Sequence, residues 1–207
     1  GILAVVSERL RAKHQLLPRA DEESFSESMP EFVPARTARR GSVAFLSGCV
    51  MNISFAGVHR DAVEVLTRNG YDVLIPKRQG CCGSLHGHNG DKNGARELAR
   101  STVAQFSGLE VDAFVIDSAG CSAFVKEYGE VLADDPDYAS RAASLAAKTK
   151  EITEVLHEVG VRPPTRPLDC RVTYHEACHL VHTQKVSEHP RRLIGLIGGV
   201  TLVELPE

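Results

Sequence analysis

The stretch Gly41-Ser42-Val43-Ala44-Phe45-Leu46-Ser47-Gly48-Cys49 combines a continuous apolar run of strand length with a cysteine just past its end. The same order of apolar run and cysteine recurs along the chain. Val73-Leu74-Ile75 is followed by Cys81-Cys82, and Ala113-Phe114-Val115-Ile116 is followed by Cys121. Several buried strands that each lead to a cysteine indicate a fold that gathers sulfur atoms in one place.

A fourth run, Arg171-Val172-Thr173-Tyr174, leads to Cys178. The carboxyl ends of parallel strands meet at the same edge of a sheet, which is where such folds bind ligands. We therefore expect sulfurs that are distant in sequence to converge on one edge of one sheet. The expected ligands are Cys49, Cys81, Cys82 and Cys121 for a first site and Cys178 for a second.

Helical segments alternate with the apolar runs. Apolar residues recur at helical spacing in residues 56–68, 92–106 and 138–159. The strands lack the period-two alternation of a half-exposed sheet, so they should be covered on both sides. The pattern predicts an α/β fold built from βα units, with a parallel sheet and helices on both faces. In the first of these helices, the inward face should hold Val58, Ala62, Val65 and Leu66.

The chain also contains an internal repeat. Residues 41–49 resemble residues 171–178, and each stretch is followed at a similar distance by a second apolar run. A second Cys-Cys-Gly would then fall shortly beyond Glu207. We divide the chain into residues 1–40, a helix over 2–17 with a linker rich in serine and proline, residues 41–165, a first α/β half, and residues 166–207, the beginning of a second half.

The composition excludes several functional classes. The 207 residues are 43% hydrophobic and 25% charged with a formal net charge of −3, which is typical of a globular protein and does not favour nucleic acid. Because no run of 18 apolar residues occurs, we expect no transmembrane segment. Six cysteines without a signal peptide favour a reducing, cytoplasmic compartment and thiols that are free or bound to metal.

Pooled thiolates carry negative charge that an iron–sulfur cluster or Zn²⁺ neutralises. The adjacent pair Cys81-Cys82 argues against simple zinc, because neighbouring side chains do not easily grip one ion but can reach two different irons. Buried cysteines that bind nothing, and a redox enzyme that uses the adjacent thiols directly, remain as alternatives. Cys170 is expected not to be a ligand. Weaker candidate ligands are His86, His88, His175 and His179.

These residues carry a family resemblance. The spacing Cys49…Cys81-Cys82-Gly83…Cys121 resembles the cysteine-rich "CCG" domain of heterodisulfide reductase and of the lactate-utilisation iron–sulfur protein. Residues 118–129 and 174–180 are similar to stretches typical of the iron–sulfur subunits of glycolate oxidase, also called glycolate dehydrogenase.

The resemblance implies an iron–sulfur electron-transfer subunit of a flavin-linked 2-hydroxy-acid (glycolate) dehydrogenase. It implies a 4Fe-4S cluster on this chain, FAD on partner flavoprotein subunits only, and no substrate site here. The electron acceptor is left open, and a quinone-linked partner at the inner face of the membrane is one candidate. The resemblance also implies a preceding ferredoxin-like region. The alternatives are a zinc-bound or metal-free assembly domain of the same complex, and a redox subunit of the lactate-utilisation or heterodisulfide-reductase kind.

One position departs from the family pattern. Many members end the motif with Cys-x₂-Cys, whereas Phe124 follows Cys121 here at the position of the second cysteine. A noncubane cluster with five thiolates is therefore not expected, and four cysteines remain for the first site.

Overall fold

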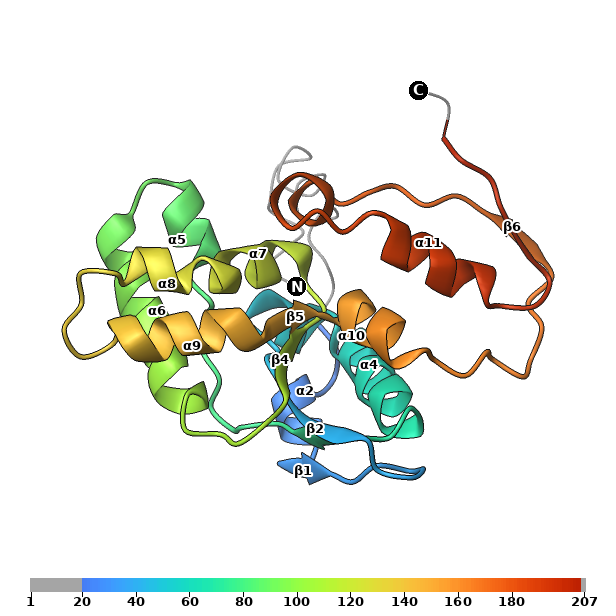
Figure 1. The fold of residues 1–207 in the computed structure, drawn as a ribbon, viewed down its shortest axis with the longest axis horizontal. Coiled ribbons are helices and arrows are strands. Elements are labelled where there is room, and N and C mark those ends of the chain that lie inside the picture. The colour runs from blue at the N-terminus through green and yellow to red at the C-terminus, as the bar shows by residue number, and fades with distance from the viewer. Residues whose placement is uncertain (1–19, 206–207) are drawn as a thin grey trace, which may run out of the picture.

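The computed structural model describes residues 20–205, which form a central five-stranded sheet (Figure 1). The helix expected over residues 2–17 lies outside the described residues. The strand order is β1-β3-β2-β4-β5, and only β1 runs antiparallel to its neighbour. The strands are β1 Phe32–Val33, β2 Gly41–Phe45, β3 Tyr71–Leu74, β4 Ala113–Ile116 and β5 Thr149–Glu151.

Helices cover both faces of this sheet. In β2, Val43 and Phe45 pack into one core and Ala44 packs into the other, because successive side chains of a strand point to opposite faces. The helices on the Ala44 side are α6 Lys92–Phe106, α7 Ala119–Lys126, α8 Tyr128–Val131 and α9 Ala139–Lys148; those on the Val43 side are α2 Phe25–Ser28, α4 Ala56–Arg68 and α10 Ile152–Val159. The predicted α/β class, a mostly parallel sheet between two helical layers, is confirmed.

Two short helices lie at the carboxyl edge of the sheet. Helix α3, Val50–Ser54, starts directly after Cys49, and α5, Ser84–His88, starts directly after Gly83. Both are therefore anchored by the loops that leave β2 and β3.

The predicted bounds of α4 are confirmed, but its inward face was misjudged. Val58 is 50% exposed and Val65 is exposed as well, whereas His59 is fully buried. The inward face of α4 therefore includes His59 in place of Val58 and Val65. The polar contacts that permit a buried histidine are described below.

The single long helix expected over residues 138–159 is wrong. The chain leaves α9 after Lys148, forms β5 beside β4, and enters α10 at Ile152. The Thr149 hydroxyl donates to the carbonyl oxygen of Leu145, and the Glu151 carboxylate accepts from the backbone N–H of Thr153. Each side chain thus satisfies a backbone group at a helix end, which makes the extended segment between the helices possible.

The linker expected before residue 41 contains ordered elements. Helix α2 and strand β1 both lie in it, and Phe25 is fully buried against Phe45, with ring centroids 5.4 Å apart. Phe25 thus anchors this segment to the core, and the pairing of β1 with β3 and the hydrogen bond from the Ser26 N–H to the Asn52 side chain hold it further.

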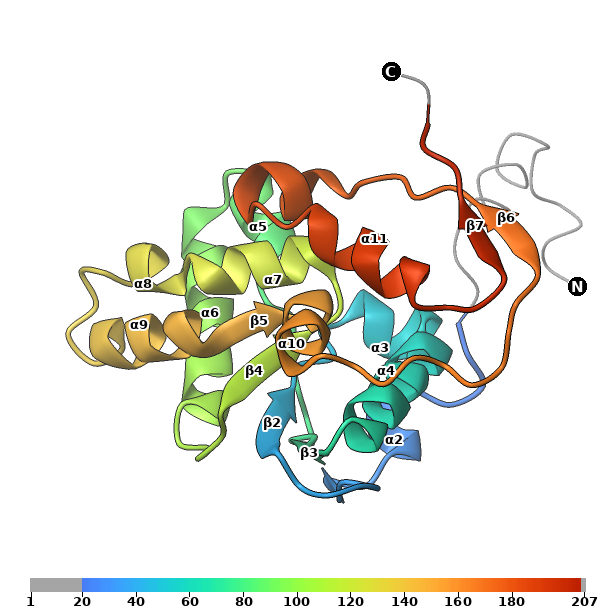
Figure 2. The same cartoon turned by 45° about the vertical axis from the view of Figure 1, so that its right-hand side comes forward.

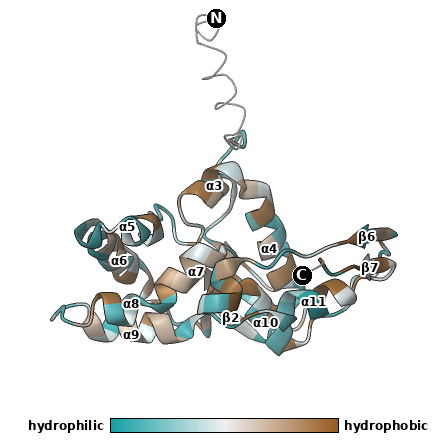
Figure 3. Ribbon diagram, turned by 90° about the horizontal axis from the view of Figure 1, so that it is seen from above, coloured by the Kyte–Doolittle hydropathy of each residue, from teal (hydrophilic) through white to brown (hydrophobic). Residues whose placement is uncertain are grey.

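The C-terminal segment forms a small parallel sheet of its own from β6, Cys170–Val172, and β7, Val200–Leu202. Figures 2 and 3 show this sheet apart from the central one. Between its strands lie the π-helix η2, His179–Thr183, and α11, Glu188–Gly195. The expectation that all cysteine-bearing strands share one sheet is therefore wrong for Cys178, because β6 pairs with β7 and not with β2 or β5.

Contacts nevertheless attach this segment to helices α10 and α7 beside the central sheet. The imidazole rings of His157 in α10 and His189 in α11 stack with centroids 4.3 Å apart. The Gln184 side-chain amide donates to the Ala119 carbonyl oxygen and the Ser122 hydroxyl in α7. Across residues 20–205, none of the helices has the length and apolar character needed to cross a membrane.

Candidate metal centre

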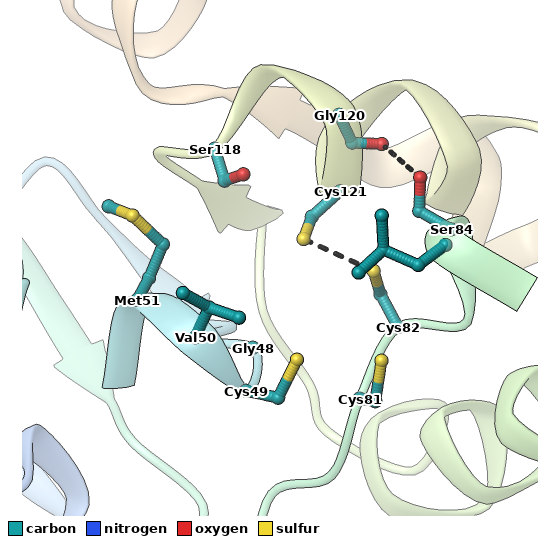
Figure 4. A pocket seen from close by; sticks show the side chains of 11 residues that line it. Gly48, Cys49, Val50, Met51, Cys81, Cys82, Ser84, Ser118, Gly120 and Cys121 are labelled. Atoms are coloured by element: carbon teal, nitrogen blue, oxygen red, sulfur yellow. Dashed lines mark hydrogen bonds between the residues drawn. The ribbon is translucent and has the colours of Figure 1, made fainter. Parts of the chain in front are cut away.

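Three loops meet at the carboxyl edge of the central sheet, one after each of β2, β3 and β4. They line an open cavity of about 190 Å³. Figure 4 shows four cysteine side chains around it. These are Cys49 from the first loop, Cys81 and Cys82 from the second, and Cys121 from the first turn of α7. The structure thus brings together the four sulfurs proposed for the first site, and what they bind remains a prediction.

Two of the sulfurs are in direct contact. The Cys82 thiol donates to the Cys121 sulfur across 3.1 Å. This hydrogen bond, aided by one from Ser118, lowers the pKa of the Cys121 thiol to about 7. The same contact raises the pKa of Cys82, and burial raises it further. Cys121 is therefore the sulfur that most readily becomes a thiolate, the form in which cysteine binds metal.

The cavity has a buried end and an open end. Cys82 is buried, with 2% of its surface exposed, whereas Cys49 is exposed. Partial removal of its sulfur from water, followed by the hydrogen bond with Cys81, raises the pKa of Cys49 even though the residue as a whole is exposed. The remaining lining is largely apolar and includes Val50, Met51 and Leu85.

Two glycines shape the loops around the sulfurs. Gly48 has φ +65°, and a Cβ there would lie 3.6 Å from the Cys121 sulfur. Gly83 has φ +88°, and its N–H donates to the Cys81 sulfur across 3.4 Å. Only glycine enters this left-handed region at little cost, so these positions let the backbone approach the sulfurs closely.

Polar side chains tie the three loops together beneath the cysteines. The Gln79 side chain accepts from the Ser47 N–H at 2.8 Å and donates to the Phe45 carbonyl oxygen at 2.9 Å. The Ser84 hydroxyl donates to the Gly120 carbonyl oxygen at 3.2 Å. The loop with the adjacent cysteines is thus bonded to both neighbouring loops.

A buried histidine joins the other two loops. His59 contacts the Asp117 carboxylate at 2.7 Å and the Ser47 carbonyl oxygen at 2.9 Å. Sequence reasoning missed His59, Asp117 and Gln79. The available signal was positional, because Gln79 and Asp117 stand shortly before a cysteine in loops already marked as functional.

Phe124 occupies the position where a fifth cysteine would stand. It packs behind the site, edge-on to Tyr128 with ring centroids 5.7 Å apart. A Cβ on Gly87 would come within 2.9 Å of its ring. The aromatic side chain therefore belongs to the core beneath the loops and does not line the cavity.

The proposed second-site cysteine lies elsewhere. Cys178 precedes η2, is exposed, and does not line the cavity. Its neighbour His179 stacks on His88 with centroids 5.0 Å apart, and His86 bonds to Asp91 at 2.9 Å. Within residues 20–205, no three histidine, cysteine or acidic side chains are close enough together to hold one metal ion.

The donor set nevertheless suits a polynuclear group. Four soft sulfur donors from three loops surround a cavity, and two of them are neighbours in sequence. Soft thiolates select iron–sulfur clusters, zinc or copper(I), and a cluster presents several metal atoms to such donors.

Comparisons with known proteins find relatives that are named as iron–sulfur proteins. The chain is 37% identical over 207 residues to the "Probable glycolate oxidase iron-sulfur subunit" of Bacillus subtilis, a match that covers 99% of this chain and 47% of that protein. It is 34% identical over 165 residues to "Lactate utilization protein A" of Shouchella clausii, covering 79% of this chain and 68% of that protein. An uncharacterized iron–sulfur protein of Methanocaldococcus jannaschii is 34% identical over 185 residues, 89% of this chain and 35% of its own length.

The chain thus spans about half the length of the Bacillus subtilis protein and a smaller share of the Methanocaldococcus jannaschii protein. The family model of the cysteine-rich (CCG) domain matches two separate segments of the chain, residues 43–126 and 172–207. Two matches to one domain fit the internal repeat seen in the sequence. Because they cover over half of the residues and include all five proposed ligands, the chain belongs to the cysteine-rich (CCG) domain family.

Proposed function

We propose that Cys49, Cys81, Cys82 and Cys121 hold an iron–sulfur cluster of the four-iron type and that the chain transfers electrons. The observation that carries this proposal is the convergence of four sulfurs from three strand ends on one cavity. Such a cluster, when bound, accepts and releases single electrons at a potential that its surroundings set.

The chain's own residues suit this role. The lowered pKa of Cys121 favours its thiolate form. Cys121 also lies at the amino end of α7, where the helix dipole favours negative charge. The Gly83 N–H points to the Cys81 sulfur, and donors of this kind raise the potential of a cluster. The apolar side chains of Val50, Met51 and Leu85 would limit the access of water.

The proposed setting is a flavin-linked dehydrogenase of 2-hydroxy acids, with glycolate as the substrate of the complex. It rests on the similarity to the glycolate oxidase iron–sulfur subunit of Bacillus subtilis. In this setting flavoprotein subunits hold FAD and oxidise the substrate, and this chain passes the electrons to a quinone-linked acceptor. The lactate-utilisation relatives make lactate the alternative substrate. The choice between the two acids would be made on the flavoprotein.

The mouth of the cavity suits the approach of a partner. Cys49 is exposed, and beside it Val50 is 49% and Leu85 is 61% exposed. Exposed apolar groups around a functional opening are typical of a docking surface. Free thiols suit a reducing compartment, so we place the protein in the cytoplasm, with its complex at the inner face of the membrane.

The domain division is part of the same proposal. Residues 41–165 would form the first half and residues 166–207 the beginning of the second. Cys178 would contribute to a separate site with residues of that second half. The exposure of Cys178 and the separate sheet of β6 and β7 support this assignment.

The experiment is anaerobic purification followed by iron, sulfide and zinc analysis, with Cys82→Ser compared against Cys170→Ser. Cys170 lies in β6, outside the cavity, and is the matched control. We expect about four irons and four sulfides in the wild type and in Cys170→Ser, and a loss of iron in Cys82→Ser. Equal iron content in the two variants would contradict the proposal.

A zinc-bound or metal-free assembly domain is the second candidate. Phe124 favours it, because it follows Cys121 at the position where the family pattern that the chain resembles has a second cysteine. About one zinc per chain without iron would support this candidate. Direct redox chemistry by the adjacent thiols is less favoured, because the pKa of Cys82 is raised and its thiol is a poor nucleophile.

A further inference from the structure

His59 is an unusual residue for the interior of a protein. It is fully buried in α4, and its ring lies edge-on to the rings of Phe25 and Phe45, at centroid distances of 4.9 and 5.1 Å. A histidine enclosed by aromatic rings must satisfy both of its nitrogen atoms, because an unpaired polar group in such surroundings is costly.

Both ring nitrogens face oxygen atoms. Nε2 lies 2.9 Å from the Ser47 carbonyl oxygen, and Nδ1 lies 2.7 Å from Oδ2 of Asp117. A carbonyl oxygen only accepts hydrogen bonds, so Nε2 must carry a proton. The short contact between Nδ1 and the carboxylate needs a second proton. A proton on Nδ1, donated to Oδ2 of Asp117, satisfies this contact and leaves the pair with no net charge.

The resulting pair is an imidazolium beside a carboxylate, with no net charge. Asp117 is 5% exposed, and its other oxygen, Oδ1, is buried without a hydrogen-bond partner among the described residues. A second buried carboxyl group, Glu151, is close enough that the charge of Asp117 raises its pKa, although burial is the larger cause. Without the proton on His59, this region would hold uncompensated negative charge, which is strongly unfavourable in a protein interior.

The pair is also electrostatically linked to the cysteine cavity. The charge of Asp117 raises the pKa of Cys121, and that of His59 lowers it. Ser47 stands two residues before Cys49, and Asp117 stands four residues before Cys121. The pair therefore connects two cysteine-bearing loops and places two opposite charges beneath them.

We infer that His59 is a positioning residue whose second proton neutralises the Asp117 carboxylate beneath the cysteine cavity. A metal centre bound in the cavity then accepts an electron without an uncompensated negative charge nearby. This inference rests on the proposed cluster. It adds a residue outside the cavity that sets the charge of the surroundings in which the electron is received.

The test is a pair of variants that separate charge from packing. In His59→Gln, the amide nitrogen takes the place of Nε2 and can still donate to Ser47, but Asp117 loses its proton donor. In the double variant with Asp117→Asn, the carboxylate charge is removed as well. The measurement is an anaerobic redox titration of the bound cluster at the same neutral pH for all three proteins.

We expect a lower reduction potential in His59→Gln, because a nearby negative charge makes the uptake of an electron harder. The double variant should return to the wild-type potential, because the two side chains at positions 59 and 117 carry no net charge in either protein. A potential that is unchanged in His59→Gln would overturn the inference. So would one that falls equally in both variants, since packing would then be the cause.

A second measurement needs neither a variant nor a cluster. In ¹⁵N-labelled, metal-free wild-type protein, the His59 ring should show directly bonded protons on both nitrogens. A ring with one protonated nitrogen would overturn the inference even if the purified protein is shown separately to bind a cluster. If the wild type binds no iron but shows both protons, the proposed function fails while the protonated pair is upheld.

Discussion

The Tyr128 hydroxyl donates a hydrogen bond to the carbonyl oxygen of Cys82 across 2.6 Å. Tyr128 is fully buried, and burial raises its pKa, so the hydroxyl stays protonated and available as a donor. The most buried of the four cysteines is thus held through its backbone by a residue 46 positions away.

Tyr128→Phe removes this donor and leaves the Cys82 carbonyl oxygen buried without it. We expect a loss of about 1–3 kcal/mol in the free energy of unfolding, as for other buried polar groups left unpaired. Faster loss of iron to a chelator should accompany it. Tyr138→Phe is the control, because no hydrogen bond to the Tyr138 hydroxyl is found within residues 20–205. Urea unfolding and iron release measure the two effects, and equal behaviour of both variants would contradict a role for Tyr128.

Gly48→Ala tests whether the cavity needs its space. The substitution forces alanine into a left-handed conformation, which costs about 1–2 kcal/mol, and places a methyl group 3.6 Å from the Cys121 sulfur. Gly90→Ala imposes similar backbone strain, at φ +80°, where no atom lies within 4 Å of the added carbon. We expect similar destabilisation in both variants but reduced iron uptake only in Gly48→Ala. Reconstitution with iron and sulfide distinguishes them, and full uptake by both would show that the space is not required.

The contact between α10 and α11 should weaken in acid. Burial, followed by the nearby charge of His157, lowers the pKa of His189 below its usual value near 6.5. A histidine with a lowered folded-state pKa binds protons more readily when unfolded, so its contribution is present above the unfolded pKa and is lost as the pH falls through the window between the two values. Protonation would also place two positive rings in a stack.

Hydrogen exchange of α11 measured from neutral pH down to pH 5 is the check. We expect faster exchange in acid for the wild type and a smaller change in His189→Gln. His182→Gln, at an exposed position in η2, is the control and should behave as the wild type does. A pH dependence that persists unchanged in His189→Gln would assign the effect to other groups.

Much of the fold could be predicted because apolar runs define it. Helices α4 and α6 and strand β4 have the bounds expected from the sequence alone. The break at Thr149 could not be foreseen, because residues 138–159 keep helical spacing of apolar residues throughout. The competing signal is local, namely side chains at 149 and 151 that bond to the backbone at two helix ends.

The convergence of the four cysteines could likewise be predicted, since it follows from parallel strands. The support beneath them could not. Val58 and Val65 are more apolar than His59, and periodicity alone places them inward. His59 is inside because Asp117, which is 58 positions away, and the Ser47 carbonyl oxygen satisfy both of its nitrogens. A polar contact between residues that are distant in sequence produces no periodic pattern from which it could be predicted.

The contact between the Cys82 and Cys121 sulfurs has a consequence for how the protein must be assembled. These thiols come from loops 39 positions apart. If an oxidant such as molecular oxygen removes two electrons and two protons from them before any metal arrives, a disulfide closes that loop, which typically stabilises a chain by about 2–4 kcal/mol. The oxidised chain would then be a stable trap that has lost two of its four ligands. The order of events, metal first and oxidant later, would decide whether newly made protein matures or is stored in an inactive form that only a reductant can recover.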